Sequence, residues 1–359
     1  MAMEPVLDSK VAKKRLLSGT GFVPFIVRRL LTSVLLVLGV TLISFTITQL
    51  VPGDPVAANL GQSAYSDPEI VAAFEKEFGL DQPVPIQYFK YLGNLLQGDL
   101  GISLSSKRPV IEDLREYFPA TFEIAIVAVF LSFFVGLLLG IISAVTRDRL
   151  PDQIIRVFSL TGVSMPAFWT ALTAFYIFFF VLGWAPGTGR LEPGGEPPPK
   201  VTGLFTIDAL IVGDFATFKQ AFAYLLLPAM VLAIYAIGVL TRFTRASILE
   251  ILGNDYVKSA RAKGLPEYLI IRRHVLRPAL LSIITVAGVA FASLLAGSVL
   301  VENVFSWPGL GQYAYRAAVG LDLPGIMGVS MVVATVYILM NLIVDILYRV
   351  IDPQMKETE

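Results

Sequence analysis

The sequence of 359 residues contains no cysteine and a single histidine, His274. Without cysteine there is no disulfide, zinc–thiolate site or thiol nucleophile, and cysteine usage says nothing about the compartment. Only 16% of the residues are charged, whereas a soluble domain usually carries about 25%. The 28 basic and 28 acidic side chains cancel, which excludes a nucleic-acid binder that relies on bulk positive charge. With 55% hydrophobic residues and a mean hydropathy of +0.71, the composition indicates a membrane protein.

Six stretches free of charged residues are long enough to cross a bilayer, which takes roughly 20 apolar residues in a helix. They are residues 30–50, 124–145, 157–182, 220–240, 278–301 and 323–344. The first stretch is too long for a signal peptide and no small-x-small cleavage site follows it, so we expect a retained helix. The sequence therefore predicts an all-α integral membrane protein, with six transmembrane helices over residues 30–350 and an N-terminal arm over residues 1–29.

The basic residues are distributed unevenly between alternate loops. One side of the predicted topology carries 19 Lys and Arg, and the other side carries 9. Because cytoplasmic loops are enriched in Lys and Arg, both termini are predicted to be cytoplasmic. Residues 52–118 then form a large external loop with helix-like stretches at 67–78 and 85–97, and residues 186–219 form an irregular external loop rich in proline and glycine. Residues 241–277 form a cytoplasmic loop.

Motifs of catalytic chemistry are missing from the sequence. There is no G-x-x-x-x-G-K-[ST], no G-x-S-x-G and no H-E-x-x-H, so we predict no catalytic residue and no metal site. Glu123 lies at the start of the second predicted span, where a helix N-terminus would stabilise its negative charge. Two roles are open for it: a structural one and a contact with the substrate. Gly136 and Gly140, four residues apart, predict close packing against a neighbouring helix.

The most informative loop is the cytoplasmic segment 254–280. Residues 255–263 are compatible with a helix that carries small and cationic side chains. Gly264 then ends the helix pattern and Pro266 opens a second helix. A short helix with a small-residue face can enter a groove on a partner protein, but a solvated basic loop that only sets the topology has the same composition. Composition alone does not decide between these two readings.

The loop resembles the coupling-loop (EAA) signature of the permease subunits of bacterial ABC importers, most closely in the dipeptide/oligopeptide/nickel branch. The resemblance rests on DYVKSARAKGL at 255–265 and RHVLRPAL at 273–280. Further matches follow in order: LVPGDP (50–55), FGLDQPVPIQY (78–88), GDLGIS (98–103), FPATFEIA (118–125), SMPAFW (164–169) and VENVFSWPGLG (301–311). Lys258, Ser259 and Ala260 replace the Glu-Ala-Ala of the general signature, which fits the peptide branch. His274 is then interpreted as an ordinary residue of this loop motif and not as a proton or metal site.

The resemblance implies the permease bundle of a type I ABC importer in the cytoplasmic membrane of a bacterium or archaeon. It implies a second homologous permease as heterodimer partner, two ATPase subunits, an external solute-binding protein and the lipid bilayer, with no nucleic acid. ATP and Mg would be bound by the ATPases, and this chain would bind no cofactor and catalyse no covalent step. The residues implied to couple to the ATPases are Asp255, Tyr256, Lys258, Ser259, Ala260, Arg261, Ala262, Lys263, Gly264 and Leu265.

On the external side, the candidates for binding-protein docking or for the substrate path are Glu302, Asn303, Trp307, Pro308 and Gly309. Trp307 could instead be an interfacial anchor, as aromatic residues at membrane boundaries often are. Peptides are the expected substrates, with nickel, glutathione or oligosaccharides as alternatives within the family. The alternatives outside it are a non-transporting scaffold and a secondary transporter or channel that works without ATPases, which needs ion-coupling groups or a filter inside the membrane.

Overall fold

The computed structural model describes residues 22–50, 54, 56–57, 59–60 and 65–351. Its regular structure within these residues is helical, apart from one isolated bridge between Ile102 and Pro109. The helices are, in chain order, α2 (Phe22–Leu50), α4 (Pro68–Phe78), α5 (Val84–Leu96), α6 (Val110–Val145), α7 (Leu150–Ser164), α8 (Ala167–Phe175), α9 (Phe205–Ile211), α10 (Phe215–Leu252), α11 (Asp255–Ala262), α12 (Glu267–Leu269), α13 (Leu276–Gly297), α14 (Val299–Val304), α15 (Leu310–Val319) and α16 (Leu323–Ile351). Two π-helical segments, Tyr176–Val181 and Ile270–Val275, continue α8 and lead from α12 into α13.

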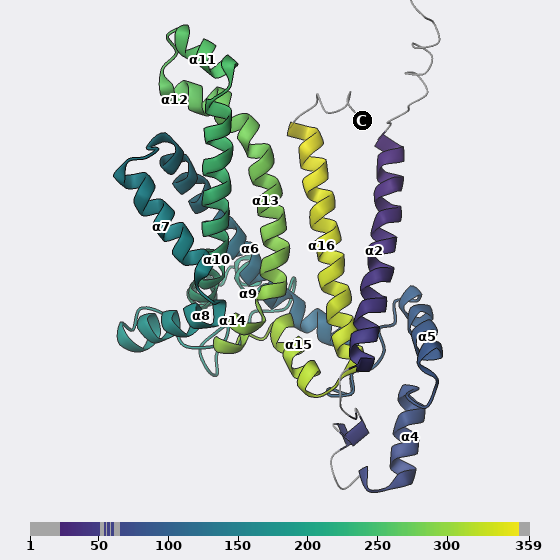
Figure 1. Ribbon diagram of the computed structural model, residues 1–359. Coiled ribbons are helices and arrows are strands. Elements are labelled where there is room, and N and C mark those ends of the chain that lie inside the picture. Colours follow the sequence, from purple (N-terminus) through teal and green to yellow (C-terminus); the bar gives the residue numbers. More distant parts are fainter. Residues whose placement is uncertain (1–21, 51–53, 55, 58, 61–64, 352–359) are drawn as a thin grey trace, which may run out of the picture.

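The long helices form an elongated bundle. Figure 1 shows α10 against α6 and α7, followed by α13, and then α16 and α2 side by side. Among the described residues, α6, α10, residues 267–295 and residues 323–347 are long and apolar enough to cross a membrane, and α7 with α8 adds a fifth span if the pair counts as one. The apolar part of α2, Leu31–Ile47, is shorter. The six predicted stretches lie mostly on helices.

The prediction of a single helix over residues 157–182 is wrong. α7 ends at Ser164, α8 begins at Ala167, and the two segments are bent by 104°. Met165 between them has an extended backbone, with φ −78° and ψ 128°. It precedes Pro166, and the proline ring disfavours the helical conformation of the residue before it.

The loop 186–219, which was predicted to be external, is also less irregular than predicted. Its first part carries no helix, but α9 begins at Phe205 and α10 at Phe215, five residues before the predicted span. The Asp214 side chain accepts hydrogen bonds from the backbone N–H groups of Ala216 and Thr217, which caps the start of α10. In the first external loop, α4 and α5 confirm the predicted helical stretches.

Glycine allows α6 and α10 to approach closely, as the spacing of Gly136 and Gly140 predicts. A Cβ atom on Gly136 would lie 2.7 Å from Cβ of Leu240, and one on Gly140 would overlap the side chain of Thr244. These two helices make an extensive contact because no side chain separates their backbones on this face.

Gly140→Ala is expected to destabilise the bundle, although alanine has the higher helix propensity. The added methyl group must displace Thr244, and such overpacking costs about 1–3 kcal/mol. Gly39→Ala is the matched control, because a Cβ atom on Gly39 of α2 meets nothing within 4 Å. Thermal unfolding of the purified variants in detergent measures both effects. An equal or higher melting temperature for Gly140→Ala than for Gly39→Ala would contradict this packing.

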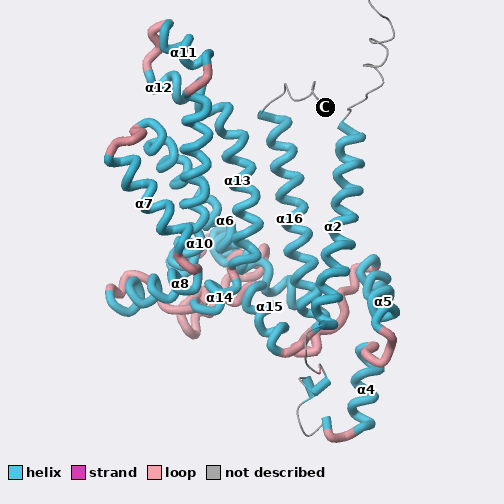
Figure 2. Tube along the Cα trace, viewed as in Figure 1, coloured by secondary structure: helices cyan, strands magenta, loops and turns pink. Residues whose placement is uncertain are grey.

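The two ends of the bundle carry different segments. Figure 2 shows α11 and α12 at the same end as the start of α2 and the end of α16, whereas α4, α5, α14 and α15 lie at the opposite end. We refer to these as the α11 end and the α4 end. The segments predicted to be cytoplasmic thus gather at the α11 end, and the predicted external loops gather at the α4 end.

Candidate functional site: the α11 helix and the α4-end network

The α11 segment has the predicted helix–turn–helix shape. α11 runs from Asp255 to Ala262, and its last turn closes with a hydrogen bond from Leu265 N–H to the Ala260 carbonyl. Gly264 has φ +77°, the left-handed region that a residue with a Cβ atom rarely adopts. Pro266 then precedes α12, and its carbonyl accepts hydrogen bonds from Leu269 and Ile270 N–H. The sequence prediction of a helix, a glycine break and a second helix is confirmed.

Two apolar side chains dock α11 on the bundle. Val257 and Ala260 are three residues apart on one face of the helix, and both are buried. They pack in a cluster with Ile248 from α10 and with Ile270 and Val275 from the segment that leads into α13. α11 is therefore fixed to the end of α10 and to the segment that leads into α13.

The opposite face of α11 is exposed. It presents a mixture of small, aromatic and charged side chains: Asp255, Tyr256, Lys258, Ser259, Arg261, Ala262 and Lys263. Gly264 is also exposed, and Leu265 is half-buried against the α11 cluster. Of the ten residues predicted to couple to ATPases, the structure brings all but Ala260 and Leu265 onto this open surface. These side chains are therefore accessible from outside the chain.

Ion pairs fix the shape of this loop. Arg261 donates to Glu267 across the glycine turn through Nε, at 2.6 Å from Oε1, and through Nη2, at 3.3 Å from Oε2. Lys258 Nζ lies 2.9 Å from Asp255 Oδ1. Because these pairs are exposed, each contributes at most about 1 kcal/mol, and their main effect is on geometry. Sequence reasoning missed Glu267, since a separation of six residues brings side chains together only after the turn is known.

At the α4 end, the segment around Glu302 folds onto α6. The Glu302 carboxylate is fully buried and accepts hydrogen bonds from the hydroxyls of Thr121 and Ser298, both at 2.7 Å, and from Gln312 N–H at 3.0 Å. Burial raises the pKa of this carboxyl above its ordinary value, and these hydrogen bonds oppose the increase. Glu302 is therefore enclosed by donors of its own chain and does not face a passing substrate in this structure.

Trp307 is buried as well, with 1% of its surface exposed, and its indole N–H donates to the Ala120 carbonyl at 2.9 Å. The alternative that Trp307 is an interfacial anchor is therefore wrong. Asn303 is half-buried and donates to the Val299 carbonyl at 2.8 Å, Gly309 is buried, and Pro308 is exposed. The five candidate residues at this end lie within residues 302–309, but they do not form one open surface.

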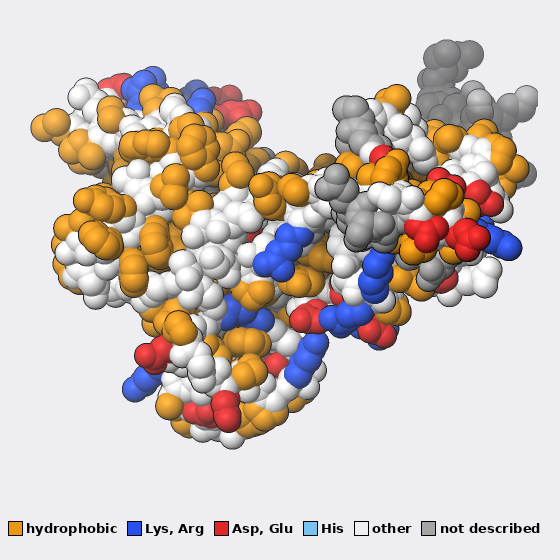
Figure 3. Space-filling view, turned by 90° about the horizontal axis from the view of Figure 1, so that it is seen from below, with side chains coloured by type: hydrophobic (Ala, Val, Ile, Leu, Met, Phe, Trp, Pro, Cys, Tyr) orange, Lys and Arg blue, Asp and Glu red, His pale blue; other side chains and the backbone are white. Residues whose placement is uncertain are grey.

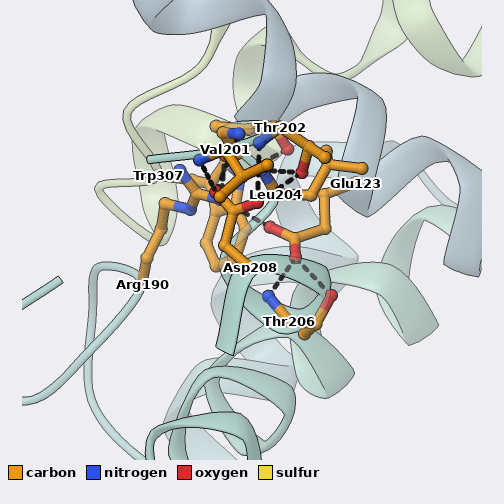
Figure 4. A network of polar contacts seen from close by, with 10 residues as sticks. Glu123, Arg190, Val201, Thr202, Leu204, Thr206, Asp208 and Trp307 are labelled. Atoms are coloured by element: carbon orange, nitrogen blue, oxygen red, sulfur yellow. Dashed lines mark hydrogen bonds and ion pairs between the residues drawn. The ribbon is translucent and has the colours of Figure 1, made fainter. Parts of the chain in front are cut away.

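A second buried network ties the loop 186–219 to α6 (Figure 4). Arg190 Nη2 donates to Glu123 Oε2 at 2.6 Å and to the Gly203 carbonyl at 3.1 Å, and its guanidinium lies 3.5 Å from the centre of the Phe205 ring. The other oxygen of Glu123 accepts from the backbone N–H and the hydroxyl of Thr206. Both oxygens of Glu123 are thus engaged, which favours the structural role weighed for it. The prediction that Glu123 lies at a helix N-terminus is wrong, because α6 already begins at Val110 and Glu123 lies within it.

Asp208 organises the end of the same loop. Its carboxylate accepts backbone N–H bonds from Val201, Thr202 and Gly203 and a hydroxyl bond from Thr202. Burial raises the pKa of Asp208, but these hydrogen bonds outweigh it and hold the pKa below its ordinary value. Arg190 and Asp208 were not singled out in the sequence. The available signal for Arg190 was weak: it is one of three charged residues in the run 186–199, which is rich in proline and glycine.

The surface at the α4 end is charged but not uniformly acidic. Figure 3, seen from this end, shows acidic and basic side chains interspersed among hydrophobic ones. An apolar helical bundle, with a docked helix exposed at one end and a mixed charged surface at the other, defines a multi-pass membrane protein.

Comparison with known proteins defines the family. Residues 136–357 match the family of binding-protein-dependent transport system inner membrane components, and residues 22–125 match the N-terminal region of such membrane components. The chain belongs to this family. It is an ABC importer permease, a multi-pass and non-catalytic subunit of the cytoplasmic membrane, which confirms the resemblance drawn from the motifs.

Several curated relatives are similar over nearly their full length. The chain is 44% identical over 321 residues to the probable D,D-dipeptide transport system permease protein DdpB of Escherichia coli (strain K12), covering 89% of this chain and 94% of the relative. It is 41% identical over 332 residues to the di/tripeptide transport system permease protein DppB of Pseudomonas aeruginosa, covering 92% and 98%. A solved structure of the MetNI methionine ABC transporter in an inward-facing conformation aligns with 65% of this chain and 93% of its own, with 18% identity and a TM-score of 0.48.

Proposed function

We propose that this chain forms half of the translocation pathway of an ATP-driven importer of di- or oligopeptides. It receives the peptide from an external solute-binding protein and couples to two ATPase subunits, which hold ATP and Mg, through residues 255–265. A second homologous permease supplies the other half of the pathway. The relatives named as dipeptide or di/tripeptide permeases favour peptides over nickel, glutathione or oligosaccharides as the substrate.

The observation that supports the proposal is that α11 is docked on the bundle through one face and exposes its other face. Val257 and Ala260 fix the helix to the ends of α10 and α13, while the small side chains of Ser259 and Ala262 leave the outer face free for a groove. When the ATPases move, the long helices must follow α11 because packed interiors transmit displacement rather than absorb it. A secondary transporter or a scaffold would not need an exposed helix such as α11 that is docked on two long helices.

The topology belongs to the same proposal. Six spans with both termini cytoplasmic are supported by the gathering of the basic loops, the start of α2 and the end of α16 at the α11 end. The bent pair of α7 and α8 counts as the third span, and α2 as the first. In the heterodimer with the second permease, the α4 end of this chain would then face outward, toward the binding protein.

Co-expression with the cognate partner subunits tests the proposal. The wild-type chain is expected to copurify with two ATPase subunits, and Ala262→Arg is expected to reduce ATPase recovery about tenfold because its side chain blocks close docking. Ala318→Arg is the matched control, since Ala318 is an exposed alanine of α15 at the opposite end. Full ATPase recovery with Ala262→Arg, or equal loss with Ala318→Arg, would refute coupling through α11.

A further inference from the structure

A groove between α7 and α10 lies apart from the α11 surface on which the proposed coupling rests. It is lined by Arg156, Leu160, Val239, Arg242, Phe243 and Arg245, and it encloses about 1010 Å³, including open space in front of it. The two helices pack side by side toward the α11 end (Figure 1). Three arginines along one groove of an apolar bundle require an explanation, because cations are costly near a bilayer interior.

The groove carries positive charge that the chain does not neutralise. Arg245 is paired, since its Nε and Nη2 each lie 2.8 Å from an oxygen of the buried Asp152. Arg156 and Arg242 are exposed, and neither pairs with a carboxylate in the described part of the chain. Two unpaired guanidinium groups beside a locked ion pair form an anion-binding rim, with planar donors suited to phosphate.

The same groove becomes apolar toward the middle of the bundle. Arg156 comes one residue before the predicted third span, and Arg242 comes two residues after the predicted fourth span. One helical turn deeper, Leu160 and Val239 line the groove, and Phe243 beside them is half exposed. The groove is therefore cationic at the level of lipid headgroups and apolar at the level of acyl chains.

We infer that this groove binds an anionic phospholipid of the bilayer. Its phosphate lies between Arg156 and Arg242, and its acyl chains run along Leu160 and Val239. A soluble anion would satisfy the arginines but leave the apolar half of the groove uncovered, whereas a lipid matches both halves. Basic pockets between membrane helices are suited to anionic headgroups for this reason.

Native mass spectrometry of the delipidated full-length chain in detergent tests the inference, with phosphatidylglycerol as the probe. Arg156→Gln/Arg242→Gln is expected to weaken phosphatidylglycerol binding at least about tenfold, and phosphatidylcholine is expected to bind weakly to all variants. Arg147→Gln/Arg149→Gln is the matched control: it removes two exposed charges from the neighbouring turn but none from the groove, and is expected to bind as the wild type does. Arg242→Lys retains the charge and is expected to keep most of the binding, which separates loss of charge from loss of fold.

Three results would overturn the inference. Unchanged phosphatidylglycerol binding by the double variant would show that the groove does not hold the lipid. Displacement of phosphatidylglycerol by millimolar inorganic phosphate would assign the arginines to a soluble anion. Loss of the bound lipid when the chain is assembled with its ATPases and second permease would assign the groove to a partner subunit, without affecting the test of α11 above.

Discussion

Gly264→Leu is expected to abolish peptide transport while the membrane bundle stays folded. Gly264 has φ +77°, and a residue with a Cβ atom pays about 1–2 kcal/mol in the left-handed region. A Cβ atom there would meet nothing within 4 Å, so the penalty comes from the backbone and not from a clash. Because α11 is only eight residues long and is held by two buried side chains, this strain is enough to change its direction. Peptide uptake and binding-protein-stimulated ATP hydrolysis in proteoliposomes measure the loss.

Gly264→Asn is the control for this experiment. Asparagine tolerates the left-handed conformation better than other residues with a side chain, so this variant is expected to retain most of the transport. The same melting temperature in both variants would show that the bundle is intact. Normal coupling in Gly264→Leu would contradict the view that the turn at Gly264 sets the position of α11.

Arg190→Met is expected to be the most destabilising single substitution at the α4 end. Arg190 and Glu123 are buried, with 7% and 4% of their side chains exposed, and their charged atoms lie 2.6 Å apart. Removing one partner leaves the other charge buried without compensation, which costs about 3–5 kcal/mol. Thermal unfolding in detergent should show a large fall in melting temperature.

Glu123→Gln/Arg190→Met is expected to recover part of this loss, since it removes both charges together. Arg147→Met is the exposed comparison: Arg147 pairs with Asp148 at 3.2 Å, both side chains are exposed, and its loss should change the melting temperature little. If Arg190→Met were as mild as Arg147→Met, the network would not hold the loop 186–219 on α6.

The sequence was sufficient to predict the features that depend on local chemistry. Apolar runs predicted where the long helices lie, and Gly264 with Pro266 predicted the turn after α11 because each residue restricts its own backbone. The bend at Met165 was equally local, and the proline after it was the available signal. A charge-free run identifies which residues are apolar, but it does not show whether the helix through them is straight.

The features that escaped prediction depend on contacts between distant parts of the chain. Arg190 and Glu123 are 67 residues apart, and Trp307 donates to a carbonyl 187 residues away. Nothing in the local pattern around Trp307 distinguishes a buried tryptophan from one at a membrane surface. The docking residue Val257 of α11 also escaped, because its burial follows from the positions of α10 and α13.

Because the chain contains no cysteine, a single introduced cysteine gives a unique attachment point. Ser259→Cys lies on the exposed face of α11, and Ser306→Cys lies on an exposed position at the α4 end. Labelled with a photoactivatable maleimide in the assembled importer, Ser259→Cys is predicted to crosslink to an ATPase subunit, whereas Ser306→Cys is predicted not to. The absence of an ATPase crosslink from Ser259→Cys in an assembled and active complex, or a crosslink from Ser306→Cys instead, would contradict coupling through α11.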